Sequence, residues 1–177
     1  MAIKHNGEVW IVTEFQHVNP GNWRAFIRTR LKQLKSGKVV DVTFRTNDPI
    51  EELRLEEKEM QFLYGTGDEL YLMDSETYDQ INVSKELLGD QGKFLKENFT
   101  VKVQFLEGHP VSATLPMFIE LKVTSAPPGV KGDTVSNLQK AVTLETGTEI
   151  QAPLFIKEGD VLKIDTRDGR YIERVSS

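Results

Sequence analysis

Three histidines, His5, His17 and His109, are the first candidates for acid–base or metal chemistry in this sequence. None has a second histidine or an acid at the spacing of a known metal site. The carboxylate pairs Glu51-Glu52 and Glu56-Glu57 are adjacent in sequence, and adjacent residues on a strand point to opposite faces. There is also no nucleophile elbow, phosphate-binding glycine loop or HExxH motif. The chain is therefore expected not to be an enzyme and to use no cofactor or metal.

The loop Pro20-Gly21-Asn22-Trp23-Arg24 carries a different kind of chemistry. Pro-Gly is a strong turn signal and asparagine tolerates left-handed backbone, so this segment is expected at a hairpin tip. A tip is a poor place to bury a tryptophan. Trp23 is interpreted as a stacking platform for a nucleobase, with Arg24 contacting phosphate or a ring face. The alternative, that Trp23 folds back onto the barrel, stays open.

The charge distribution favours contact with a polyanion at one place. The 177-residue chain has a net charge of −5, which argues against coating nucleic acid by bulk electrostatics. Residues 15–40 nevertheless contain no acid, and an acidic stretch follows at residues 48–59. The cations of the acid-free window are Arg24, Arg28, Arg30, Lys32, Lys35 and Lys38. A local basic face on an acidic chain is typical of an RNA contact, with chance clustering on a solvated strand as the alternative.

These groups must be positioned by strands, because apolar alternation with a period of two dominates the chain. Residues 8–12, 25–31 and 38–44 are predicted strands, and the middle one has a basic outer face. Short strands with glycine turns favour a small SH3-like barrel. Arg28 and Arg30 on this face are expected to add salt-dependent affinity for RNA.

Two further modules are expected after Asp48-Pro49. Residues 53–63 can be read as helix or strand, and their alternation favours strand, whereas residues 84–94 are the best helix candidate. Five short strands with glycine-bearing turns suit an OB-like barrel. They are residues 118–123, 141–144, 149–152, 161–164 and 171–175. In the last of them, Tyr171 and Arg174 are either an exposed aromatic–basic pair or a core tyrosine beside a surface arginine.

The remaining composition limits where the protein works. No apolar run reaches the roughly 18 residues of a membrane helix, and the first residues lack the pattern of a secretory signal. The chain has no cysteine, which is compatible with a bacterial cytoplasm. No membrane partner is expected.

Motifs in the C-terminal half carry a family resemblance. They are KAVTLETG at 140–147, APLFI at 152–156, EGD at 158–160, IDTRDGRY at 164–171 and PPGVKGDT at 127–134. Together with residues 15–44, they resemble bacterial elongation factor P over essentially the whole chain. The resemblance implies three small β-barrel domains in an L-shaped, tRNA-like monomer. These are an SH3-like (KOW-type) domain at residues 1–52 with the tRNA-facing loop, and OB-fold domains at residues 53–116 and 117–177.

The same resemblance implies a cytoplasmic elongation factor that binds the 70S ribosome between the peptidyl and exit tRNA sites. It would stimulate peptide-bond formation at consecutive prolines by positioning peptidyl-tRNA, while the ribosome does the chemistry. The implied tRNA acceptor-end loop is Pro20, Gly21, Asn22, Trp23 and Arg24. Implied contacts to rRNA or tRNA involve Arg28, Arg30, Lys32, Tyr171 and Arg174, the last two facing the anticodon stem. Gly132, Asp133 and Thr134 would approach exit-site mRNA.

Two departures from the family pattern stand out. Asn22 occupies the position where the family carries a modified lysine or arginine, and asparagine can take neither an amine-linked lysyl group nor a rhamnose. Trp23 stands where glycine is usual. Family members also carry more residues before the first strand, which leaves open a misplaced start at Met1 or a truncated chain.

Two other readings compete with this one. An elongation factor P-like paralogue would share the architecture, but Gly132-Asp133-Thr134 and the ending Asp165-Thr166 through Tyr171 favour the factor itself. A generic single-stranded-RNA-binding OB protein should bind RNA free of ribosomes. Its aromatic residues should cluster on one barrel face instead of at a hairpin tip.

Overall fold

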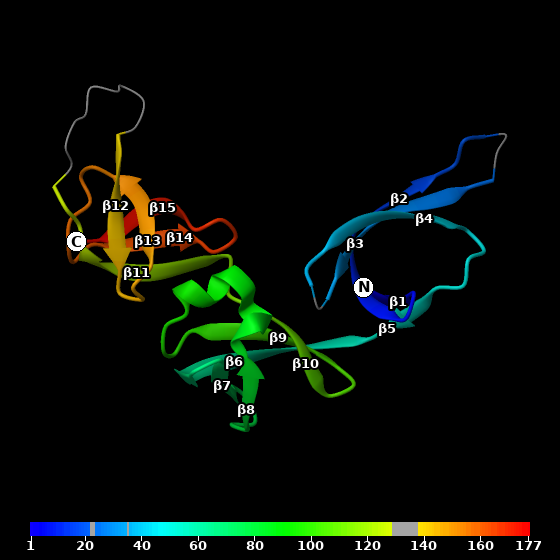
Figure 1. Ribbon diagram of the computed structural model, residues 1–177, viewed down its shortest axis with the longest axis horizontal. Coiled ribbons are helices and arrows are strands. Elements are labelled where there is room, and N and C mark those ends of the chain that lie inside the picture. Colours follow the sequence, from blue (N-terminus) through cyan, green and yellow to red (C-terminus); the bar gives the residue numbers. More distant parts are fainter. Residues whose placement is uncertain (22–23, 35, 129–137) are drawn as a thin grey trace. The chain divides into compact units, whose positions relative to one another are not determined.

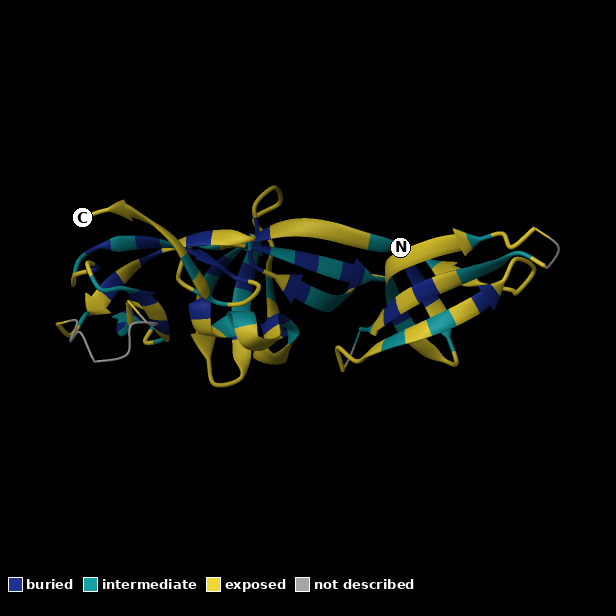
Figure 2. Ribbon diagram, turned by 90° about the horizontal axis from the view of Figure 1, so that it is seen from above, coloured by how far each residue is buried: buried dark blue, intermediate teal, exposed yellow. Residues whose placement is uncertain are grey.

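The computed structural model describes residues 1–21, 24–34, 36–128 and 138–177, and most of these residues lie in β-strands (Figure 1). They form three antiparallel sheets of five strands, accompanied by one short 3₁₀ helix. The predicted all-β class is therefore confirmed. Buried and exposed residues alternate along many of the strands, as the sequence pattern predicts (Figure 2).

The first sheet has the strand order β4-β3-β2-β1-β5. Its strands are β1 (Ala2–His5), β2 (Glu8–Val18), β3 (Phe26–Gln33), β4 (Val39–Arg45) and β5 (Glu51–Leu53). A core of Ile3, Trp10, Leu31 and Phe44 holds this module together. The three strands predicted here are confirmed. Beyond Val12 the strand β2 has no buried residue. The end of the β2–β3 ribbon is therefore exposed on its β2 side and forms an arm, while β3 stays paired with β4 as far as Phe26 and Arg45.

The second sheet has the order β10-β9-β6-β7-β8, which is the strand arrangement of an OB fold. It comprises β6 (Leu55–Thr66), β7 (Glu69–Asp74), β8 (Gln80–Ser84), β9 (Thr100–Leu106) and β10 (His109–Thr114). The ambiguous segment 53–63 is strand, as its alternation favours. The predicted helix appears as η1 (Lys85–Phe94), where Ser84 accepts a hydrogen bond from the Glu86 N–H and Gly89 interrupts the helical backbone.

The third sheet has the order β13-β12-β11-β14-β15. Its strands are β11 (Phe118–Ser125), β12 (Gln139–Leu144), β13 (Glu149–Pro153), β14 (Val161–Asp165) and β15 (Arg170–Ser176). Leu121, Leu144, Leu162 and Ile164 are fully buried at its centre. The five short strands predicted for this module are confirmed.

The chain divides into two compact units, Met1–Lys58 with Val103–Ser112 and Glu59–Lys102 with Ala113–Ser177. Within the second unit, η1 and the segment after it contact the third sheet. The Thr148 hydroxyl donates to the Lys93 carbonyl at 2.7 Å, and Lys96 pairs with Glu145 at 3.0 Å. In the described residues, no helix is long and apolar enough to cross a membrane. The domain boundaries after residues 52 and 116 stay a prediction.

Candidate nucleic-acid interface

The predicted tip is joined to the first module by the exposed arm of β2 and β3. Pro20 and Gly21 are exposed, and Gly21 has a φ of 76°, a left-handed conformation that glycine adopts without strain. Arg24 is also exposed. Asn22 and Trp23 lie outside the described residues, so their predicted roles stay predictions. The turn chemistry of the flanking residues agrees with a hairpin connection between β2 and β3.

The basic residues of β3 lie on one face of the first sheet. Phe26, Arg28, Arg30 and Lys32 alternate with Ile27, Thr29 and Leu31, of which Thr29 and Leu31 are buried. Residues directly opposite one another on neighbouring strands share a face. Gln16, Arg28 and Thr43 therefore form one row across β2, β3 and β4, and Glu14, Arg30 and Asp41 form the next. The first row is neutral apart from Arg28, whereas the second holds two carboxylates.

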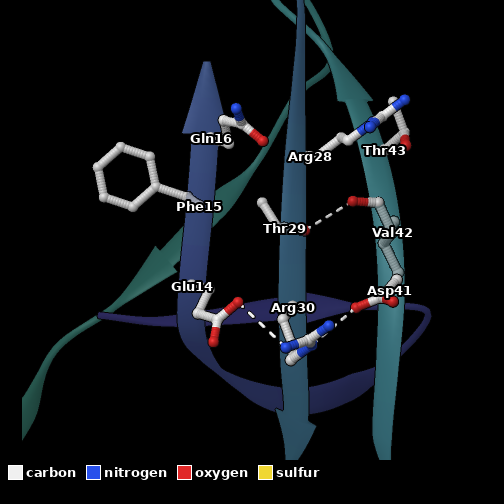
Figure 3. A pocket seen from close by; sticks show the side chains of 9 residues that line it. All are labelled: Glu14, Phe15, Gln16, Arg28, Thr29, Arg30, Asp41, Val42 and Thr43. Atoms are coloured by element: carbon white, nitrogen blue, oxygen red, sulfur yellow. Dashed lines mark hydrogen bonds and ion pairs between the residues drawn. The ribbon is translucent and has the colours of Figure 1, made fainter. Parts of the chain in front are cut away.

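Arg30 is bound by carboxylates on both sides (Figure 3). Its Nε donates to Asp41 Oδ1 at 3.0 Å, and its Nη1 lies 3.1 Å from Glu14 Oε2. The hydrogen bond to Asp41, reinforced by the charges of Asp41 and Glu14, raises the pKa of Arg30 above its ordinary value. Arg30 thus links three strands, and its charge is compensated within the sheet.

Arg28 differs from Arg30 in its surroundings. Its guanidinium carbon lies 5.6 Å from the centre of the Phe26 ring, a cation–π geometry that orients the side chain. Among the described residues it has no ion-pair partner. The two rows, together with Phe15, Thr29 and Val42, line an open depression of about 620 Å³ on this sheet (Figure 3). Its lining combines one uncompensated cation with the amide of Gln16 and the hydroxyl of Thr43.

The C-terminal pair is brought together by an irregularity in β15. Tyr171 lies opposite Ile164 and Arg174 opposite Leu162, with a register shift between Lys163 and Ile164. In a regular strand, residues three apart point to opposite faces, but the extra residue of the shift places both on one side. Tyr171 is half-buried. The structure thus brings the two residues together, while their RNA role stays a prediction.

Arg174 already has partners within the chain. Its guanidinium lies 3.7 Å from the buried Asp160 carboxylate and 5.5 Å from the centre of the Phe155 ring. Its side chain is 42% exposed. It can therefore present part of its guanidinium to a ligand while Asp160 holds its position. Gly132, Asp133 and Thr134 lie outside the described residues.

Sequence reasoning missed Arg45. It closes β4 directly opposite Phe26, on the face that carries Arg28. Because Phe44 is buried, the alternation of β4 alone was enough to place Arg45 outward, but its position beside Phe26 depends on the register of β3 and β4. Within the described residues, no group of three or more His, Asp or Glu side chains is arranged to hold a metal.

Comparison with known proteins identifies the family. Three family models match in order: an elongation factor P KOW-like domain at residues 1–50, an elongation factor P OB domain at 55–113 and an elongation factor P C-terminal domain at 119–174. The elongation factor P of Natranaerobius thermophilus is 49% identical over 99% of this chain and 93% of its own length. The chain belongs to the elongation factor P family. The elongation factor P of Chloroflexus aggregans is likewise 49% identical, over 99% of this chain and 94% of its own.

A solved structure supports the architecture of this elongation factor P family member. The eukaryotic translation initiation factor 5A from Methanococcus jannaschii matches with a TM-score of 0.51 and 16% identity. The match covers 64% of this chain and 84% of that protein. At this identity the similarity concerns the fold alone. It agrees with the assignment of SH3-like and OB-like barrels.

Proposed function

We propose that this chain is a cytoplasmic translation elongation factor that binds the 70S ribosome between the peptidyl and exit tRNA sites. There it stimulates peptide-bond formation at consecutive prolines without being an enzyme itself. The observation that carries the proposal is the match to elongation factor P proteins along nearly the whole chain. The arm of β2 and β3, which leads to the loop at residues 20–24, is consistent with it.

The physical basis of the stimulation is positioning. The ribosome supplies the catalytic groups, and the factor holds the acceptor end of peptidyl-tRNA in a reactive geometry. Restricting the motion of a reactant can supply several kcal/mol, up to about 7–11 for ideally oriented reactants. Because proline is a poor nucleophile in a constrained backbone, peptide-bond formation at proline benefits most from this positioning. Peptidyl-tRNA, rRNA and exit-site mRNA are the proposed partners.

The tip must act without the usual modified side chain, because Asn22 cannot take either modification. In the first version of the proposal, Trp23 stacks on the acceptor end. Trp23→Ala should then lower the synthesis of a polyproline reporter in a reconstituted translation system, while a reporter without prolines is made at the wild-type rate. Unchanged polyproline synthesis would rule out the stacking role.

In the second version, Arg24 carries a modification instead. Intact mass spectrometry of protein purified from its native host distinguishes the two versions. An added mass that maps to Arg24 after digestion supports this version, and the mass of the bare chain excludes it. Addition of the wild-type protein to the polyproline assay tests the proposed function itself, since a lack of stimulation contradicts both versions.

A second candidate function, ribosome-free binding of single-stranded RNA, has one observation in its favour. Tyr64 and Tyr71 stack across β6 and β7 with ring centres 4.5 Å apart, and Tyr64 is 51% exposed. The carboxylate of Glu69 lies beside them, accepting from the Tyr71 hydroxyl and the Asn82 amide, and it would repel a phosphate. Tight binding of free RNA that Tyr64→Ala abolishes would favour this candidate.

A further inference from the structure

We infer that Arg28 and Arg45 together form a binding site for an RNA phosphodiester on the first sheet, oriented by Phe26. The inference deepens the proposed function and rests on it for the identity of the RNA. It concerns the face of β3 and β4 next to the arm, and it includes a residue outside the acid-free window of the sequence.

The first step is the relative position of the two arginines. Phe26 lies directly opposite Arg45, and Arg28 lies opposite Thr43, so Arg28 and Arg45 are diagonal neighbours on one face. Diagonal neighbours on antiparallel strands are about 7–8 Å apart, well within the reach of two long side chains. Both residues are exposed. The two guanidinium groups can therefore converge on one ligand of the size of a phosphate.

The second step is the charge that remains after internal pairing. Glu14 and Asp41 face Arg30 and compensate it. The nearest acid to Arg45 in sequence is Asp48, whose Oδ2 accepts from the Arg45 backbone N–H at 2.8 Å. Within the described residues, neither Arg28 nor Arg45 has an ion-pair partner. At the end of the sheet where Phe26 pairs with Arg45, the unpaired positive charge is thus that of Arg28 and Arg45, while Lys32 lies toward the other end of β3.

The third step is the fixed orientation of the site. Phe26 supports the Arg28 guanidinium by cation–π contact at 5.6 Å, and the Thr46 hydroxyl donates to the Ala25 carbonyl at 2.9 Å, tying the end of β4 to the start of β3. Less side-chain freedom is then lost on binding. Arginine is also the side chain whose planar fork fits phosphate oxygens in a bidentate manner.

The ligand chemistry follows from these groups. Two arginines attract a phosphate, and the neighbouring amide of Gln16 and hydroxyl of Thr43 can bond to ribose or phosphate oxygens. Glu14 and Asp41 at the next row disfavour a second phosphate there. We therefore assign one phosphodiester of an RNA strand to this site, contacted through its backbone and not read by sequence.

The direct test is an NMR titration of the full chain, which observes the Nε–Hε signals of its arginines. The probes are a short single-stranded RNA oligomer of mixed sequence and inorganic phosphate at the same phosphate concentration. We expect the RNA to shift the Arg28 and Arg45 signals together, and Arg30 to move less. Unshifted Arg28 and Arg45 signals would overturn the site, and equal shifts with inorganic phosphate would overturn its assignment to RNA.

A second measurement places the site in the ribosomal complex. Ribosome affinity is followed over a range of salt concentrations for Arg28→Gln, Arg45→Gln and the control Lys38→Gln, an exposed cation at the far turn of β3 and β4. Each arginine change should reduce the slope of log affinity against log salt by about 0.7 to 0.9, and Lys38→Gln should leave it unchanged. Equal slopes for all three variants would contradict the inference. A wild-type protein that fails to bind ribosomes refutes the proposed function, while the NMR result still decides the site.

Discussion

Gly169 provides a sensitive test of how the second unit is packed. It lies in the turn between β14 and β15 with a φ of +72°, and a Cβ atom placed on it would lie 3.0 Å from Cζ of Phe94 in η1. Phe94 is 1% exposed, so its ring cannot move aside into solvent. Gly169→Ala should therefore lower the free energy of unfolding for two reasons: the left-handed backbone strains an alanine, and its Cβ atom approaches the Phe94 ring too closely.

The two costs can be separated by a matched variant. Gly147 has a similar φ of +83°, but a Cβ atom added there would have no atom within 4 Å, so Gly147→Ala meets the backbone cost alone. That cost is about 1–2 kcal/mol. Overpacking adds about 1–3 kcal/mol, which gives a total of about 2–5 kcal/mol for Gly169→Ala. In a Phe94→Leu background, Gly169→Ala should lower the unfolding free energy by little more than Gly147→Ala does, because the close approach to the ring is removed.

The assay is urea unfolding followed by two signals. Far-ultraviolet circular dichroism reports on all three sheets, whereas both tryptophans, Trp10 and Trp23, belong to the N-terminal part of the chain. The Gly169→Ala change should move the dichroism transition to lower urea and leave the tryptophan transition in place. If Gly169→Ala and Gly147→Ala lowered the unfolding free energy by the same amount, the packing of Phe94 against this turn would be refuted.

Two further predictions concern charged groups. The hydrogen bonds from Arg167 hold the pKa of the buried Asp165 at about 2, below its ordinary 3.8. The carboxylate thus stabilises the fold above pH 3.8 and loses this effect as the pH falls toward 2. In an acid titration, the difference in unfolding free energy between wild type and Asp165→Asn should therefore become smaller between pH 3.8 and pH 2. Arg30→Gln should lower the unfolding temperature seen by tryptophan fluorescence, because it removes the ion pairs with Glu14 and Asp41. It should leave the salt slope of ribosome binding unchanged, because the charge of Arg30 is already compensated by these two carboxylates. A slope as low as that of Arg28→Gln would show that Arg30 also contacts RNA.

Local pattern was sufficient to predict most of the fold. The alternation of residues 25–31 places Leu31 in the core and Arg28 outside, since side chains of a strand point alternately to its two faces. The glycine turns separate the strands of the third sheet in the same way. Such information lies within a few residues, so it is readable without knowing which strands pair.

Features that depend on pairing could not be predicted in this way. The residues Tyr171 and Arg174 reach one side only because β15 contains a register shift, which no alternation reveals. The contact of Phe94 with Gly169 joins segments that lie far apart in sequence. In both cases the missing information is the register or packing of one segment against another, which tertiary contacts determine.

The basic window shows how pairing changes a functional interpretation. By sequence alone, every cation in residues 15–40 would be available to RNA. Glu14 and Asp41 lie just outside the two ends of this window. Because β2 and β4 pair with β3 on either side, both acids lie next to Arg30 and form ion pairs with it. The same pairing adds Arg45, which lies outside the window, to Arg28. A cation contributes to polyanion affinity through the counterions that its contact releases, so a cation already paired with carboxylates contributes little. The affinity of this face for RNA should therefore follow Arg28 and Arg45, and not the total charge of the window.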